Sequence, residues 1–172
     1  MTPEEEAYAE ALHRIHEAEE TGEVELDLSK LSALNRLPRE LERLTSLQTL
    51  DLSSCEQLSG DLAPLAGLTA LRTLDLSHCW QLSDLGPLSG LTSLQRLDLY
   101  KCLEIRDLRP MAGLTSLQRL TLSWCEQLTE FTLPTGLRSL QTLDLSRVLT
   151  TSARKPPLRS ARFEAEIALL PF

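Results

Sequence analysis

Leucines and polar residues alternate along this chain in a phrase that recurs at a constant spacing. The phrase L-x-x-L-x-L-x-x-C occurs four times, and its cysteines are separated by steps of 24, 23 and 23 residues. These cysteines are Cys55, Cys79, Cys102 and Cys125. A fifth copy has Val148 in the cysteine position, and a shortened opening copy starts at Leu26. A period of this length predicts a repeat architecture in which each copy forms one structural unit.

The central L-x-L of each copy predicts a short β-strand. Side chains alternate along a strand, so both leucines point inward and the residue between them points outward. One such strand cannot bury its leucines alone. Stacking the copies pairs the strands in parallel, about 4.8 Å apart, and creates one continuous core. The strands should line the inner, concave face, with the rest of each repeat forming the outer wall.

The outer wall has a pattern of its own. In residues 82–91 and 105–114 apolar residues recur at every third position, with a proline between them. A spacing of three favours a short 3₁₀ turn over an α-helix. Residues 131–134, after Cys125, shift the last apolar position, so we expect an irregular outer wall there.

These phrases resemble the leucine-rich-repeat family over residues 22–148, and D-L-x-P-L-x-G-L-T-S-L resembles the internalin-type repeat of bacterial proteins. The resemblance implies an α/β fold, a right-handed leucine-rich-repeat solenoid. Its curved parallel sheet would form the concave face, and short 3₁₀ turns and loops would form the convex face. It also implies a role in protein binding.

An open solenoid end exposes leucines, so a cap is required. Thr2 can cap a helix, Pro3 suits the first helical position, three glutamates complement the helix dipole, and Gly22 ends the helix. The expected buried stripe consists of Tyr8, Leu12 and Ile15.

We therefore divide the chain into a capping helix (1–22), a solenoid of about six repeats (23–148), and a C-terminal segment (149–172). That last segment is either a second cap or a free docking tail. The opening residues resemble those of bacterial signalling and immunity proteins, which suggests a bacterial source.

Composition narrows the class of partner. The 172-residue chain carries a net charge of −8, which argues against a nucleic-acid partner because such proteins usually show a basic face. It has no run of eighteen apolar residues, so no membrane span is expected. The N-terminus lacks the basic start and apolar run of a secretory signal, and we expect a cytoplasmic protein.

The residues capable of chemistry have simpler structural explanations. Cysteines at one repeat position should form a row, which cannot converge on a tetrahedral metal, and parallel Cβ vectors disfavour disulfides. We expect free, buried thiols that donate weakly to the backbone. His13 and His16 should be solvated, and the row of aspartates should be solvated and hydrogen-bonded rather than bind calcium. No catalytic motif is found, so we expect neither an enzyme nor a cofactor or metal.

Departures from the repeat indicate the candidate binding site. The residue before each cysteine varies, Tyr100 interrupts a row of serines, and both tryptophans fall in the same region. Trp, Tyr and Arg are enriched at binding hot spots. The candidate partner-binding residues are His78, Trp80, Arg96, Tyr100, Lys101, Arg119 and Trp124. Random drift at exposed positions would also produce such a cluster.

Two functions fit these observations. The first is a non-enzymatic recognition or regulatory subunit that binds a protein through its concave face, in a bacterial signalling or defence complex. Its partner would present an acidic or mixed surface loop, and a hetero-complex is favoured over a homo-oligomer. The alternative is a structural or assembly adaptor that docks larger proteins through the solenoid ends and the C-terminal segment.

Overall fold

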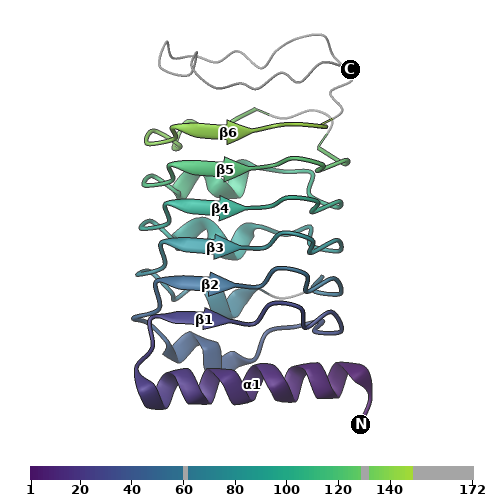
Figure 1. Ribbon diagram of the computed structural model, residues 1–172. Coiled ribbons are helices and arrows are strands. Elements are labelled where there is room, and N and C mark those ends of the chain that lie inside the picture. Colours follow the sequence, from purple (N-terminus) through teal and green to yellow (C-terminus); the bar gives the residue numbers. More distant parts are fainter. Residues whose placement is uncertain (60–61, 129–131, 149–172) are drawn as a thin grey trace.

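The computed structural model describes residues 1–59, 62–128 and 132–148. Within these residues the chain forms one α-helix, a six-stranded parallel sheet and four short 3₁₀ turns, wound as a right-handed coil (Figure 1). The helix is α1 (Pro3–Thr21). The strands are β1 (Glu25–Asp27), β2 (Thr49–Asp51), β3 (Thr73–Asp75), β4 (Arg96–Asp98), β5 (Arg119–Thr121) and β6 (Thr142–Asp144). The fold predicted from the repeat is confirmed.

The sheet is in register from one repeat to the next. Strand order follows the sequence, β1 to β6, and equivalent residues pair at every step, as in Leu50 with Leu74 and Leu97 with Leu120. The central leucine of each strand is buried, whereas the residues on either side are exposed or half-buried. The repeat period therefore sets both the pairing register and the inward face of each strand.

The opposite face consists of 3₁₀ turns, each of which buries one large apolar side chain: Leu41, Leu65, Leu88 and Met111. The turns span Arg39–Arg43, Ala63–Leu65, Gly86–Gly90 and Arg109–Gly113. Three of them begin with a proline at the first or second helical position, where the missing N–H leaves no bond unmade. In the last connection, residues 132–141 form turns but no 3₁₀ helix, in agreement with the shifted apolar pattern.

Helix α1 lies under β1 and closes the first end of the stack (Figure 1). Thr2 and Glu5 form a reciprocal capping box, and Gly22 ends the helix in the left-handed conformation with φ 70°. Of the predicted apolar stripe, Ile15 is buried as expected, whereas the prediction is wrong for Tyr8 and Leu12. The buried residues are Ala7, Ala11, Ile15 and Ala18. Tyr8 and Leu12 are only half-buried, because small side chains let the helix approach the end of the core closely.

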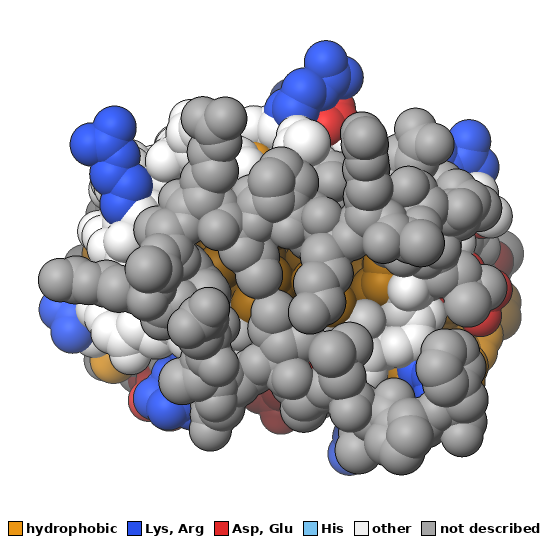
Figure 2. Space-filling model, turned by 90° about the horizontal axis from the view of Figure 1, so that it is seen from above, with side chains coloured by type: hydrophobic (Ala, Val, Ile, Leu, Met, Phe, Trp, Pro, Cys, Tyr) orange, Lys and Arg blue, Asp and Glu red, His pale blue; other side chains and the backbone are white. Residues whose placement is uncertain are grey.

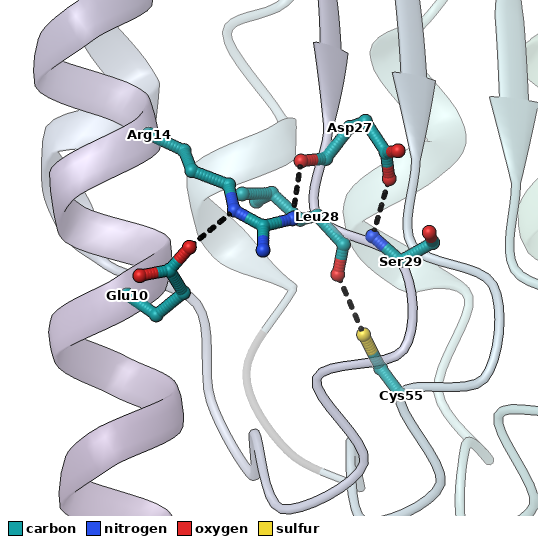
Figure 3. A network of polar contacts seen from close by, with 6 residues as sticks. All are labelled: Glu10, Arg14, Asp27, Leu28, Ser29 and Cys55. Carbon is teal, nitrogen blue, oxygen red and sulfur yellow. Dashed lines mark hydrogen bonds and ion pairs between the residues drawn. The ribbon is translucent and has the colours of Figure 1, made fainter.

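The helix also supplies a hydrogen bond that a missing repeat would have made. Within the stack, the carbonyl of each strand's third residue accepts an N–H from the preceding repeat, as Leu28 donates to Asp51 at 2.8 Å. No repeat precedes β1, and the Arg14 guanidinium donates to the Asp27 carbonyl at 3.1 Å (Figure 3). Glu10 holds that guanidinium at 2.8 Å. The helix therefore satisfies one backbone carbonyl at the exposed edge of the sheet as well as covering the leucines at this end.

Viewed from above β6, hydrophobic side chains lie at the centre of the solenoid, and Lys and Arg side chains lie around its periphery (Figure 2). The C-terminal segment predicted as cap or tail, residues 149–172, lies outside the described residues. Within the described ranges no helix has the length and apolar character needed to cross a bilayer.

Candidate partner-binding face

The varied residue before each cysteine occupies a special backbone conformation. In the described part of the chain six non-glycine residues have positive φ, between 58° and 64°. They are Lys30, Ser54, His78, Lys101, Trp124 and Arg147. We call them the left-handed column. The N–H of each of the first five donates to a carbonyl of the next repeat at 2.8–3.0 Å, so the column continues the sheet's backbone ladder.

None of the six is glycine or asparagine, the residues that adopt this conformation most readily. A left-handed conformation costs an ordinary residue about 1–2 kcal/mol. Because this conformation recurs in all six repeats and continues the backbone ladder, it belongs to the repeat turn, and only the side chain that it presents differs from one repeat to the next.

Four members of the column and Tyr100 form a continuous stack of rings and cations across β3 to β6. The His78 and Tyr100 rings meet edge to face, with centroids 5.2 Å apart. The Lys101 ammonium lies 5.4 Å from the Tyr100 centroid and 5.9 Å from the Trp124 centroid. The Arg147 guanidinium lies 5.5 Å from the Trp124 ring. We call His78, Tyr100, Lys101, Trp124 and Arg147 the cation–aromatic stack.

The stack brings together four of the seven predicted residues. Arg96 and Arg119 are exposed and pair across β4 and β5, so they lie side by side at the start of their strands. Trp80 is 41% exposed, and no contact in the described residues joins it to the stack. Arg147 was not predicted as a site residue, although its place in the varied column was a signal that could have included it.

The aspartates between the leucines stabilise turns. Asp27, Asp51, Asp75, Asp98 and Asp144 each accept, through Oδ1, the backbone N–H two residues later, at 2.7–2.9 Å. Such local bonds explain why the L-D-L phrase recurs. No group of three or more metal-ligating side chains occurs among the residues described.

The pKa values of Asp27 and Asp98 are shifted in opposite directions. Bonds from the Ser29 side chain and backbone lower the pKa of Asp27. Burial raises the pKa of Asp98, and repulsion from Asp75 and Asp144 adds to the effect, while His78 acts in the opposite direction. Asp98 therefore lies in a row of carboxylates whose charges repel one another.

The cysteines are free, fully buried and hydrogen-bonded to the backbone. Each Sγ donates to a leucine carbonyl in the preceding repeat at 3.1–3.4 Å, as Cys55 does to Leu28 (Figure 3). Burial raises the pKa of Cys55 and of Cys125 to about 12. These thiols tie successive repeats together and are poor nucleophiles, since the thiolate is the reactive form.

The family model described as leucine-rich repeats (2 copies) matches the chain twice, at residues 45–89 and 69–113. A comparison with the curated proteins finds no match.

The solved structures similar to the chain include the following three. Internalin C2 of Listeria monocytogenes is 24% identical, with a TM-score of 0.52 and 86% of each chain covered. A leucine-rich-repeat protein of Leptospira interrogans is 24% identical, with a TM-score of 0.59, over 85% of this chain and 41% of that one. TLR13, in a complex with single-stranded RNA, is 27% identical, with a TM-score of 0.56, over 74% of this chain and 20% of that one. The family match within residues 45–113 and these neighbours agree with the observed structure: the chain carries leucine-rich repeats and folds as a leucine-rich-repeat solenoid.

Proposed function

We propose that this protein is a non-enzymatic recognition module that binds another protein through the sheet face between β3 and β6. The observation that carries the proposal is the cation–aromatic stack. It links five side chains over successive repeats, and its Trp124 remains 37% exposed. Aromatic and arginine side chains of this kind supply most of the binding energy at protein interfaces.

The backbone beneath the stack supports the proposal. A stiff parallel sheet holds these side chains, and neighbouring cations already restrict the rings, so little freedom is lost on binding. Arg96 and Arg119 lie beside the stack and add positive charge, which fits a partner with an acidic or mixed surface. We further propose a hetero-complex in the cytoplasm of a bacterium, with a signalling or defence role. The row of reduced thiols is compatible with a reducing compartment.

Affinity capture with two matched double variants tests the function. Tyr100→Ala/Trp124→Ala removes both rings of the stack, and Thr49→Ala/Ser53→Ala trims the plain surface of β2 on the same sheet face. We expect the ring variant to lose about 2 kcal/mol or more of binding, roughly thirtyfold in affinity. The control variant should bind as the parent does. Circular dichroism should show the same fold in both.

Equal capture of the same partner by both variants would refute the proposed site. That result would favour the alternative, an adaptor that docks through the solenoid ends and the C-terminal segment. Single-stranded RNA should be included as a probe because the TLR13 neighbour was solved with it. The net charge of −8 leads us to expect no RNA binding by this chain.

A further inference from the structure

The charged residues of the sheet face are divided into two halves. We consider the first and third residue of each strand together with the left-handed column. Over β1–β3 these positions hold four acids and one lysine, namely Glu25, Asp27, Asp51, Asp75 and Lys30. Over β4–β6 they hold four bases and two acids, namely Arg96, Lys101, Arg119, Arg147, Asp98 and Asp144. Arg72, at the edge just before β3, reduces the contrast without reversing its sign.

The positive half is concentrated at Arg96 and Arg119. These residues are cross-strand neighbours, so their backbones are about 4.8 Å apart. Both are exposed, and neither forms an ion pair within the described part of the chain. Two adjacent like charges repel in the free protein, and an acidic group placed between them from outside relieves that repulsion.

Thr121 leaves Arg119 without a carboxylate in its own strand. It pairs with Asp98 on one side and Asp144 on the other, in the position that holds aspartate in the five other strands. An aspartate there would lie two residues from Arg119 on the same face and would compete for it. Thr121 has no carboxylate to accept the turn N–H, so β5 forgoes a bond that its neighbours make. Thr121 departs from the repeat pattern and loses a local hydrogen bond at a charged surface, and such a departure points to a role in binding.

We infer that the partner segment recognised by this face is charge-segregated. Its acidic end lies over β4–β6, its basic end lies over β1–β3, and Thr121 is the residue that determines the acidic preference. The inference rests on the proposed function and specifies its partner. The centres of the two halves, β2 and β5, are three strand steps apart, about 14 Å. An extended chain covers that distance in about four residues.

Two peptides of identical composition test the inference. The segregated probe is Glu-Glu-Glu-Gly-Lys-Lys-Lys, and the alternating probe is Glu-Lys-Glu-Gly-Lys-Glu-Lys, both with blocked termini and a fluorescent label. Fluorescence anisotropy at low salt should show at least fivefold tighter binding of the segregated probe. Equal binding, or no measurable binding of the segregated probe, would overturn the inference.

Two variants with the same change in net charge test the role of Thr121. Thr121→Asp adds a carboxylate beside Arg119, and Thr92→Asp adds one at an exposed position on the 3₁₀-turn side. We expect Thr121→Asp to weaken the segregated probe at least fivefold, with little change in melting temperature because the restored turn acceptor offsets the repulsion from Asp98 and Asp144. Thr92→Asp should leave binding unchanged. If the two variants changed the affinity for the segregated probe equally, the role of Thr121 would be overturned. The proposed function would not be affected by that result, because it is tested separately by partner capture with the Tyr100 and Trp124 variant.

Discussion

Four glycines at the same repeat position differ sharply in the room available to a side chain. A Cβ atom added to Gly67 would meet nothing within 4 Å, and one on Gly90 would lie 3.5 Å from a backbone oxygen. On Gly113 it would lie 2.0 Å from the Ser89 carbonyl oxygen, and on Gly136 1.7 Å from that of Ala112. Successive turns therefore approach each other more closely toward β6, and Gly113→Ala should destabilise the protein while Gly67→Ala should not.

The size of the effect follows from these distances. The oxygen near Gly113 belongs to the backbone, so a contact at 2.0 Å can be relieved only by separating the two turns. Overpacking of this kind costs about 1–3 kcal/mol. At Gly67 the alanine restricts the unfolded chain without a clash, which stabilises by about 0.4–1 kcal/mol. The two variants should thus differ by about 1.4–4 kcal/mol, or about 3–16 °C in melting temperature for a chain of this size.

Thermal and urea unfolding followed by circular dichroism measure this difference. The two variants make the same chemical change at equivalent positions, so each serves as the other's control. Equal stabilities, or a Gly113→Ala protein that is more stable than Gly67→Ala, would refute the close approach of the turns.

Three further predictions follow from the hydrogen bonds and pKa shifts. Arg14→Met removes the donor to the Asp27 carbonyl and should destabilise by about 0.5–1 kcal/mol, measured by urea unfolding, because water can hydrate this exposed carbonyl in part; an unchanged midpoint would contradict the bond. Cys102, whose pKa is raised well above its usual value by burial, should resist a thiol reagent in the folded protein and react after unfolding; fast labelling of the native protein would contradict its burial. Asp98→Asn should raise the melting temperature at pH 7, because the raised pKa means that the folded state disfavours the charge, and the gain should vanish below the unfolded pKa near 4. Asp27→Asn should do the reverse: it should lower the melting temperature at pH 7 and have little effect below the lowered pKa of the folded state. If both variants changed the melting temperature at pH 7 in the same direction, the two pKa shifts would be contradicted.

Four of the five residues of the cation–aromatic stack were predicted from the sequence, but their arrangement was not. The sequence places His78, Lys101 and Trp124 in one column because the repeat period is constant. It does not reveal that the column is left-handed, since no glycine or asparagine marks it. That conformation brings Lys101 between two rings and Arg147 over Trp124, and the contact, rather than the spacing, is what adds Arg147 to the site.

The sequence by itself determined the repeat. A leucine pattern with a constant period can bury its apolar side chains only by stacking identical strands, so the parallel register and the buried cysteine row follow from the spacing. Helix ends are also local, which is why Thr2 and Gly22 mark the limits of α1 correctly.

Only the tertiary structure decided how closely the elements approach. The end of the core selected the alanine-rich stripe of α1 over the one containing Tyr8 and Leu12, because small side chains permit a shorter distance between helix and sheet. The same is true of the turns, where Gly67 and Gly113 occupy equivalent phrases in the sequence but differ completely in crowding. The distance between neighbouring repeats depends on all the side chains packed between them, so it cannot be predicted from a local pattern in the sequence.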